Sequence, residues 1–450
     1  MRATVGLREE IIMTDRSDII SKAARRILPI LMLCYLAAFL DRVNIGFAAL
    51  TMNGDLGFSA SAFGFGAGIF FLGYVLCELP SNLMLARVGA RLWIARILIT
   101  WGILSALTAF VWNPASFYVV RILLGAAEAG FFPGMIFYMT LWFPRAYRGS
   151  MFSSFNVAVP LASVLGAPIS GLILENLNGV AGLQGWQWMF LIEGLPAIIM
   201  GLVVFFALPD RPASASFLNE EERSWLTKRL DSEREAQEKV EHFSVGRALV
   251  DPRVLLMCLI AVGLVIGTTG IAIWMPQFIK QFGLSTLQTS LVAAIPFVFM
   301  AVAMITVGRH SDKTGERVWH TAGPFIASAI GFVIAAFAGN PFVGVIGLTI
   351  GAAGIGGASP TIWIFPSTLL TGTAAAAGIA LINSVGSTGG FFGPTIIGWV
   401  RDATGGFQGA LLFLAAAMAV TAAAIFILGY SMRDLMRPKA SAALSARTQS

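Results

Sequence analysis

The 450-residue sequence predicts an all-α membrane protein that crosses the bilayer twelve times, in two pseudo-symmetric halves of six helices each. Three observations carry this prediction: the composition, the long apolar segments, and the side on which basic residues fall. Hydrophobic residues make up 57% of the chain and charged residues only 12%, about half the charged share of an ordinary soluble protein. So few charges cannot cover a soluble surface, and most side chains must therefore face lipid or other membrane helices.

Apolar segments of about twenty residues, the length that spans a bilayer as a helix, recur along the whole chain. The first half contains six such segments, at 27–51, 62–84, 92–112, 116–142, 150–174 and 187–208. The second half contains six more, at 253–279, 287–308, 319–338, 341–365, 375–400 and 409–430. The predicted parts are a cytoplasmic arm (1–26), a six-helix half (27–208), a cytoplasmic linker (209–252), a second six-helix half (253–430) and a cytoplasmic tail (431–450).

The positions of lysine and arginine test this division and set the orientation of the chain. With the N-terminus inside, 26 of the 30 basic residues fall on the cytoplasmic side, as the positive-inside rule requires. Both termini are therefore expected in the cytoplasm, in a multi-pass protein of the cell's inner (plasma) membrane. Because this topology accounts for the net charge of +6, the charge does not indicate a nucleic-acid partner.

The linker between the halves is the longest polar segment of the chain. Asn219, with Glu222 three positions later, resembles the start of a helix. Apolar residues at Trp225 and Leu226 would let such a helix lie against the membrane bundle. A solvated connector is nevertheless the preferred interpretation for a segment that carries this much charge.

The two halves repeat each other at an offset of 226 residues. Gly57-Phe58-Ser59 aligns with Gly283-Leu284-Ser285, and Pro168 aligns with Pro394. Such coincidences at one offset indicate that both halves descend from one six-helix unit. In proteins built from repeats of this kind, the substrate site lies between the repeats near the middle of the bilayer.

Spans one and four of the first half contain a cluster of four charged side chains, at Asp41, Arg42, Arg121 and Glu128. A charge at the centre of a membrane helix costs at least ~2.5–3.5 kcal/mol, so each one needs a reason. A guanidinium makes bidentate pairs with a carboxylate, which assigns Arg42 and Arg121 to an anionic substrate. Burial favours the protonated form of a carboxyl group, which assigns Asp41 and Glu128 to proton coupling. The alternative is that the two acids and two bases neutralise one another and only hold helices together.

The spans of the second half contain neutral hydrogen-bonding groups in place of charges. Asn383 is the candidate substrate contact among them, and Tyr74 in the first half is a second hydrogen-bonding candidate. Glu193, at the opening of the sixth span, is interpreted as structural. The three cysteines are far apart and lie in apolar segments, so neither a metal site nor another cofactor is expected.

The loop after the eighth span carries a recognisable motif, Gly308-x-x-x-Asp312-Lys313-x-Gly315-x-Arg317. It resembles the cytoplasmic loop motif of the major facilitator superfamily, and the resemblance implies the fold of that superfamily. We expect Gly308, Asp312, Gly315 and Arg317 to act in gating, with Asp312 and Arg317 tying neighbouring helices on the cytoplasmic side.

Three motifs in the first half resemble the anion:cation symporter family more narrowly, at Leu40–Gly46, Glu78–Leu83 and Glu128–Gly134. The stretch from Ala48 to Tyr74 looks most like the tartrate-transporter branch of that family. Symporters of this family use the Asp-Arg pair of span one and the Arg and Glu of span four, which match Asp41, Arg42, Arg121 and Glu128. The resemblance implies import of a small organic anion by proton symport.

Two departures from the family bear on the substrate. Val159, three residues after Asn156, stands where similar sugar-acid carriers tend to have glutamine, and Phe39 stands where they tend to have tyrosine. Both changes remove hydrogen-bonding groups, which favours a small dicarboxylate such as tartrate. An aromatic acid resembling phthalate or hydroxyphenylacetate, or a sugar acid, is the alternative.

Other classes of protein fit the sequence less well. No catalytic constellation or phosphate loop appears, so the chain is not expected to be an enzyme. A charge cluster confined to one half favours alternating access over a continuous pore. The expected partners are a small organic anion, a proton in preference to sodium, and the lipid bilayer, and the chain is expected to act as a monomer.

Overall fold

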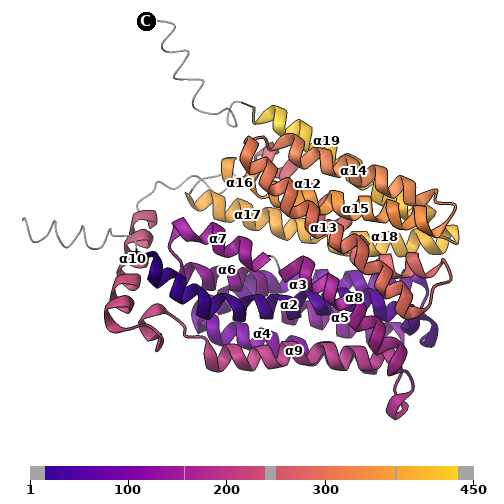
Figure 1. The fold of residues 1–450 in the computed structure, drawn as a ribbon, viewed down its shortest axis with the longest axis horizontal. Helices are drawn as coiled ribbons and strands as arrows, with labels where there is room; N and C mark the ends of the chain where they lie inside the picture. Colours follow the sequence, from indigo (N-terminus) through magenta and orange to yellow (C-terminus); the bar gives the residue numbers. More distant parts are fainter. Residues whose placement is uncertain (1–15, 157, 239–249, 370–371, 434–450) are drawn as a thin grey trace, which may run out of the picture. The chain divides into compact units, whose positions relative to one another are not determined.

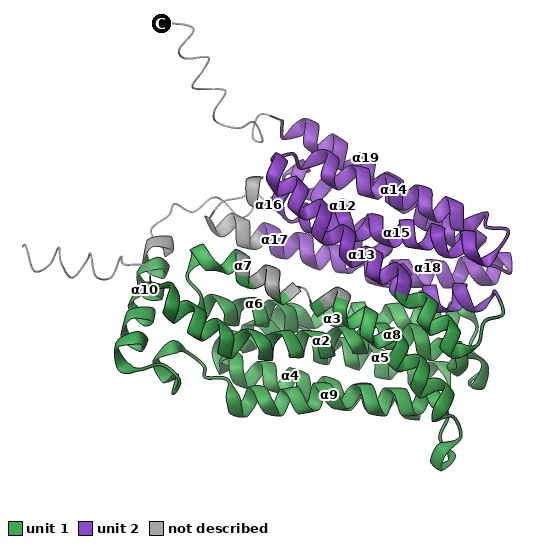
Figure 2. Ribbon diagram, in the orientation of Figure 1, with its two compact units in different colours: residues 1–240, 283–294 green, residues 241–282, 295–450 purple. Residues whose placement is uncertain are grey.

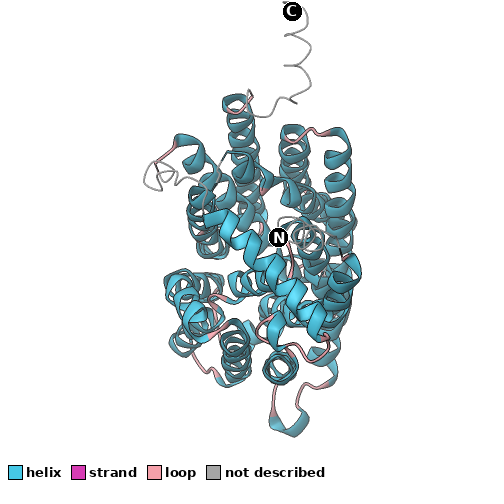
Figure 3. Cartoon of the chain, turned by 90° about the vertical axis from the view of Figure 1, so that its left-hand side faces the viewer, coloured by secondary structure: helices cyan, strands magenta, loops and turns pink. Residues whose placement is uncertain are grey.

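The computed structural model describes residues 16–156, 158–238, 250–369 and 372–433, which are helical with short connections and contain no strand (Figure 3). Ten helices of this described chain are long and apolar enough to cross a membrane. The prediction of an all-α membrane protein is therefore confirmed. The helices form two compact units, unit 1 (1–240 and 283–294) and unit 2 (241–282 and 295–450), which Figure 2 colours separately.

Unit 1 is built on α2 (Ser17–Asp55), which is followed by membrane-length helices and shorter pieces (Figure 1). These are α3 (Ala60–Val88), α4 (Ala90–Leu107), α5 (Pro114–Glu128), α6 (Phe131–Trp142), α7 (Arg145–Asn156), α8 (Ala158–Asn176), α9 (Gly185–Ala207) and α10 (Glu220–Glu238). Short 3₁₀ turns form η1 (Thr108–Phe110), η2 (Val180–Gly182) and η3 (Pro212–Ser214).

Unit 2 repeats this plan with another set of long apolar helices (Figure 1). They are α12 (Pro252–Lys280), α13 (Thr286–Thr314), α14 (Val318–Ala336), α15 (Pro341–Ile362), α16 (Ile364–Leu369), α17 (Gly372–Ser387), α18 (Gly389–Thr404) and α19 (Gln408–Ser431). The first residues of α13 belong to unit 1.

Two predicted spans are divided between shorter helices. The predicted span at 375–400 is covered by α17 and α18. The described residues of the predicted span at 150–174 belong to α7 and α8. The fourth span is interrupted where α5 ends at Glu128 and α6 begins at Phe131. Gly130 lies in this break with a left-handed backbone (φ 84°), which glycine adopts without steric penalty.

Close packing between the long helices depends on glycine. In unit 1, a Cβ atom added to Gly194 of α9 would lie 2.9 Å from the backbone oxygen of Gly102 in α4. In unit 2, a Cβ atom at Gly331 of α14 would lie 2.5 Å from the backbone nitrogen of Gly351 in α15. Small residues of this kind let membrane helices approach until their backbones touch, which explains the 48 glycines of the chain.

The linker forms helix α10, which lies across one end of the other unit 1 helices (Figure 1). The predicted helix start is present, because Asn219 Oδ1 accepts from the Glu222 backbone N–H (2.8 Å) and Glu222 Oε2 accepts from the Asn219 backbone N–H (2.8 Å). Leu226 is fully buried and Trp225 nearly so. Lys22 of α2 forms an ion pair with Glu222 (2.8 Å). The helix therefore packs on the bundle, as the apolar stripe predicts, and is not a solvated connector.

Candidate functional site

Helix α5 carries two of the four predicted charged residues, and its ends are defined by local sequence. Asn113 caps its start, because its Oδ1 accepts from the Ser116 backbone N–H (2.8 Å) while Ser116 Oγ accepts from the Asn113 N–H (3.2 Å). Arg121 lies two turns into the helix, and Glu128 is its last residue. Both side chains are buried, with 5% and 0% of their surface exposed.

Glycines bring α3 against this helix. A Cβ atom at Gly125 of α5 would lie 1.9 Å from the Phe70 backbone oxygen, and one at Gly73 of α3 would lie 2.2 Å from the Ile122 backbone oxygen. No larger residue fits at either position without moving a backbone. This close approach places the Phe70 ring 5.0 Å from the Arg121 guanidinium, a distance at which the cation is attracted to the ring face.

Arg42 of α2 forms an ion pair with Glu128 of α5 through its Nη2 atom and Glu128 Oε1. The Glu128 side chain is 1% exposed and that of Arg42 is 29% exposed. A carboxylate at the C-terminal end of a helix is disfavoured by the helix dipole, and Arg42 offsets that cost. The sequence places Arg121 and Glu128 on one helix face, but the structure shows that the ion-pair partner of Glu128 is Arg42.

Asp41 lies beside Arg42 in sequence but in different surroundings. Its carboxylate accepts hydrogen bonds from Trp101 Nε1 (2.6 Å), from Asn44 Nδ2 (3.0 Å) and from the Ser105 hydroxyl. Trp101 and Ser105 both lie on α4, so Asp41 faces α4 while Arg42 faces α5. Three donors satisfy most of the acceptor capacity of an ionised carboxylate.

The arginines of this cluster keep unused hydrogen-bonding capacity. Among the described residues, Nε of Arg42, Nε of Arg121 and Oε2 of Glu128 are buried without a partner. Buried polar atoms in native proteins are nearly always paired, so three such atoms together require an explanation. Two guanidinium groups with free donors are suited to bind a planar carboxylate.

Tyr74 of α3 also belongs to this cluster, and its side chain is 6% exposed. The Arg42 guanidinium lies 5.8 Å from the Tyr74 ring and 5.3 Å from the Phe39 ring. Asn383 belongs to α17 in unit 2, where its backbone oxygen accepts from the Ser387 hydroxyl (2.9 Å). The structure thus brings together five of the six predicted binding and coupling residues, all within unit 1.

The predicted gating motif forms the connection between α13 and α14. Arg317 Nη1 pairs with Asp312 Oδ1 (2.7 Å) and donates to Ser311 Oγ (2.9 Å). Gly315 has a positive φ of 71°, which explains why the turn uses glycine. Gly308 lies one turn before Asp312 and faces Pro360, whose Cγ would be 3.4 Å from an added Cβ atom. The ion pair joins the last turns of α13 to the residue that precedes α14, and a role of these residues in gating stays a prediction.

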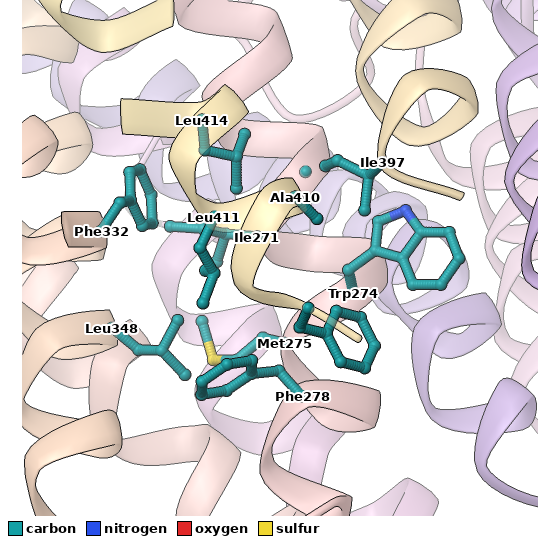
Figure 4. Close-up of a pocket in the computed structure, with 12 residues that line it drawn as sticks. Ile271, Trp274, Met275, Phe278, Phe332, Leu348, Ile397, Ala410, Leu411 and Leu414 are labelled. Carbon is teal, nitrogen blue, oxygen red and sulfur yellow. The ribbon is translucent and has the colours of Figure 1, made fainter. Parts of the chain in front are cut away.

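Unit 2 contains a separate apolar pocket (Figure 4). It is lined by aromatic and aliphatic side chains of α12, α14, α15, α18 and α19, among them Trp274, Phe278, Phe332 and Leu411. No predicted site residue lines it, and none of its lining residues is charged. It therefore offers no group that would hold an anion.

Sequence reasoning missed the side chains that surround the charges. The donors to Asp41 are Asn44, Trp101 and Ser105. Asn44 follows Asp41 by three residues, and Ser105 follows Trp101 by four, so helical spacing gave a signal for shared faces. Helical spacing gave no signal that the face of α2 with Asp41 and Asn44 packs against the face of α4 with Trp101 and Ser105. The side chains of Asn156 and Val159, which bear on substrate size in the sequence, lie outside the described residues.

Comparison with known proteins gives a consistent result. A profile of the Major Facilitator Superfamily matches residues 31–394. A protein of Agrobacterium vitis named "Putative tartrate transporter" is 52% identical over 410 residues, covering 91% of this chain and 94% of that protein. The "Putative metabolite transport protein NicT" of Pseudomonas putida is 43% identical over 393 residues, covering 87% of this chain and 90% of that protein.

Solved structures share the fold. One is a bacterial homolog of the human lysosomal transporter Spinster, in an inward-facing and unoccupied conformation. It superimposes with a TM-score of 0.77 at 16% sequence identity, covering 92% of this chain and 99% of that one. The predicted fold class is therefore confirmed.

Proposed function

The chain belongs to the Major Facilitator Superfamily, and on this premise we propose that it is a secondary active transporter that imports a small organic anion together with a proton. Transport proceeds by alternating access. The protein lies in the cell's inner (plasma) membrane with both termini in the cytoplasm, and it acts as a monomer.

One observation carries this proposal: two arginines, Arg42 and Arg121, are held with unpartnered Nε atoms inside a helix bundle. Leaving a buried donor unpaired costs about 1–3 kcal/mol, and more when the group is charged. A bound carboxylate would satisfy these donors. Substrate binding is therefore the simplest reason for the chain to keep them.

The ion pair between Arg42 and Glu128 supplies a coupling mechanism. With Asp41 and Glu128 ionised, the two acids balance the two arginines and the cluster has no net charge. A proton on Glu128 removes the negative partner of Arg42, which frees that guanidinium and leaves the cluster with one positive charge. An anion can then bind to the freed Arg42 guanidinium, where the negative charge of Glu128 previously repelled it. The proton and the substrate therefore favour each other's binding.

A small dicarboxylate resembling tartrate is the proposed substrate. Two carboxylates match two arginines, and the 52% identical relative from Agrobacterium vitis carries tartrate in its name. An aromatic acid is the second candidate, because the rings of Phe39, Phe70 and Tyr74 lie 5.0–5.8 Å from the two guanidinium groups. These rings could pack against an aromatic substrate.

The remaining predicted residues have supporting roles in this proposal. Tyr74 and Asn383 donate or accept hydrogen bonds at the substrate hydroxyl or carboxyl groups. Gly308, Gly315 and the Asp312–Arg317 ion pair form part of a cytoplasmic gate. The pair ties α13 to α14 and would have to rearrange when that gate opens.

Coupling is tested by neutralising each acid. Asp41→Asn and Glu128→Gln mimic permanently protonated groups, so neither should accumulate labelled tartrate against its gradient in proteoliposomes with an imposed proton gradient. Exchange of substrate for substrate needs no proton cycle and should survive in Glu128→Gln. Asp41→Asn can also lose exchange, because Asp41 adjoins Arg42. Accumulation at the wild-type level in both variants would overturn the coupling proposal and leave the acids with a structural role.

Substrate identity is tested by binding. Purified protein should bind tartrate more tightly than phthalate, hydroxyphenylacetate or a hexonate, as measured by calorimetry. Tighter binding of an aromatic acid would replace the first candidate substrate with the second. Channels are excluded by counterflow, because labelled substrate accumulates transiently against unlabelled substrate in a carrier and does not do so in a pore.

A further inference from the structure

Arg96 on α4 is a charged residue that the proposed transport mechanism does not use. It lies on the same helix face as a row of apolar side chains spaced three or four residues apart, namely Leu92, Ile99, Ile103 and Leu107. Leu92 is 45% exposed, Ile103 46% and Leu107 45%. An exposed apolar face of a membrane helix contacts lipid acyl chains. Arg96 therefore lies on a lipid-facing side of unit 1.

The Arg96 side chain lacks a polar partner in the protein. No hydrogen bond or ion pair joins its guanidinium to any residue of the described ranges, and its Nε is buried without a partner. Arg91, five residues earlier on the same helix, differs because it forms an ion pair with Asp210 (3.2 Å). Charged residues in membrane helices nearly always pair with another group, so an unpaired arginine on the lipid side requires an explanation.

The Arg96 side chain is directed toward the start of α4. Its guanidinium lies 3.9 Å from the centre of the Trp93 ring, one turn nearer to that end, as expected because helical side chains lean toward the N-terminus. Arg96 is six residues from Ala90, the first residue of α4, which is ~9 Å along the axis. An arginine at this depth reaches the lipid headgroups with its charge while its stem stays among apolar groups.

Trp93 provides a fixed platform for this guanidinium. Its Nε1 donates to Ser81 Oγ on α3 (3.0 Å), and Ser81 is 6% exposed. The ring is thus held by a buried partner on a neighbouring helix. Contact with the ring attracts the cation but supplies no oxygen acceptor, so the N–H donors of Arg96 remain available to a ligand.

The charges at this end of α3 and α4 favour an anionic ligand. Arg87 in the last turn of α3, Arg91 and Arg96 lie close together in sequence. The acid Asp210 is already paired with Arg91. The proposed topology places this end of α4 at the cytoplasmic leaflet, whose anionic lipids attract basic clusters.

We propose that Arg96, held against Trp93, binds the headgroup phosphate of an anionic phospholipid whose acyl chains lie along the apolar face of α4. Phosphate oxygens accept the N–H groups that the protein leaves unpaired. Ile103, deeper in the membrane on the same face, contacts the acyl chains. This site is separate from the Arg42 and Arg121 cluster, and its ligand is not the transported anion.

Lipid binding is tested by native mass spectrometry of the purified, full-length protein in detergent. Titrated with phosphatidylglycerol, the wild type should retain a discrete bound lipid, and it should bind phosphatidylcholine more weakly because the choline cation faces a basic cluster. Equal binding of the two lipids, or no retained lipid, would overturn the proposal.

The residue assignment is tested with Arg96→Gln, which should bind phosphatidylglycerol roughly tenfold more weakly, as for a lost hydrogen bond to a charged group. Arg87→Gln is the matched control, because it removes the same charge from an exposed position and should leave the affinity unchanged. Equal losses in the two variants would indicate a general effect of charge and overturn the site. If Arg96→Gln does not fold, Arg96→Lys replaces it: lysine lacks the planar fork, so wild-type affinity in that variant would equally overturn the proposal.

Thermal unfolding in detergent distinguishes a lipid from a free anion. A ligand that binds only the folded protein raises its melting temperature, so phosphatidylglycerol should raise that of the wild type and not that of Arg96→Gln. Inorganic phosphate should raise neither. Stabilisation of the wild type by inorganic phosphate as large as that by the lipid would overturn the assignment to a phospholipid.

These measurements do not depend on the proposed function. Neither lipid binding nor lipid-dependent stabilisation requires transport, so the site stands if proton symport fails. If the wild type accumulates substrate but Arg96→Gln retains wild-type affinity for phosphatidylglycerol, symport stands and the lipid site fails.

Discussion

The two units differ in what they bury. Among the described residues, five charged side chains are buried: Asp41, Glu78, Arg121, Glu128 and Glu193. All five belong to unit 1, and the polar side chains buried in unit 2, such as Gln277 and Thr361, are neutral. Over the part that the structure describes, unit 2 forms a bundle of the same kind without a buried charge. Folding of such a bundle therefore does not require buried charges, and the proposed transport function gives a reason for their cost in unit 1.

The two units also differ in the partners of their arginines, as Arg401 in unit 2 and Arg42 in unit 1 show. Arg401 near the end of α18 donates to neutral Gln277 Oε1 (2.7 Å), and its guanidinium lies 4.5 Å from the Phe407 ring. Arg401 thus contacts an amide and an aromatic ring, and its partner is not a buried carboxylate. Arg42, in contrast, is paired with Glu128, which has 1% of its side chain exposed. An arginine paired with a titratable group can respond to a proton, and one paired with an amide cannot.

The largest effect is expected when the Arg42–Glu128 pair is broken from one side. Arg42→Met leaves Glu128 without its counter-ion, which should lower the stability in detergent by about 3 kcal/mol, the low end for a buried pair because Glu128 can take up a proton. The double variant Arg42→Met with Glu128→Leu should recover most of that loss, since no unpaired charge remains. Neither variant should transport. Thermal unfolding and uptake measure the two effects.

A control variant in unit 2 shows whether this loss is specific to the ion pair. Arg401→Met in unit 2 removes an arginine whose hydrogen-bond partner is neutral, so it should cost only about 1.5 kcal/mol, the low end for a hydrogen bond that involves a charged group. A double variant as unstable as Arg42→Met would show that unit 1 needs the pair in order to fold. The contrast between the units would then be one of architecture and not of function.

A smaller effect is expected from Arg121→Lys, which keeps the charge and loses the planar fork. Substrate affinity should fall roughly tenfold, equivalent to about 1.4 kcal/mol, because one ammonium cannot replace bidentate contacts. Arg401→Lys is the matched substitution in unit 2 and should leave affinity unchanged. Both are measured by calorimetry with tartrate. Unchanged affinity in Arg121→Lys would remove Arg121 from the binding site.

The sequence predicts the fold and the charged members of the site, because both follow from strong energetic rules. Apolar length predicts the spans, and the cost of intramembrane charge identifies Asp41, Arg42, Arg121 and Glu128. Pairing could not be predicted in the same way. The seven-residue spacing of Arg121 and Glu128 indicates a shared helix face, but the rotation of α2 against α5 decides that Arg42 reaches Glu128.

The surroundings of Asp41 depend on a similar long-range contact. Its donors Trp101 and Ser105 come from α4, about sixty residues away in sequence. No local rule connects them to span one. Interhelical packing in a membrane depends on where small residues allow close approach, and a single sequence does not reveal which helix faces meet there.

The smallest effect on stability is expected from hydrogen-bonded glutamates at the surface. There we expect the two units to depend on pH in the same way. In unit 2, Glu316 Oε1 accepts from the Trp319 backbone N–H (2.8 Å), and Oε2 accepts from that of His320 (3.1 Å) and from the His320 ring (2.7 Å). Partial burial raises the pKa of Glu316, but these hydrogen bonds outweigh it and hold the pKa below its ordinary value. In unit 1, hydrogen bonds from Lys22 and the Asn219 backbone N–H hold the pKa of Glu222 below its ordinary value.

A lowered pKa in the folded state stabilises the fold above the pKa of the unfolded chain, and this stabilisation is lost as the pH falls through the folded value. At neutral pH, Glu316→Gln should therefore cost ~0.5–1 kcal/mol, the low end for a lost helix cap because the side chain is partly exposed. The difference in melting temperature between wild type and variant should shrink as the pH falls below the ordinary glutamate pKa of about 4.3, and it should disappear below the lowered pKa of the folded protein. Glu222→Gln should show the same pH dependence. If only one of the two does so, the units differ at their surfaces as well as in their interiors.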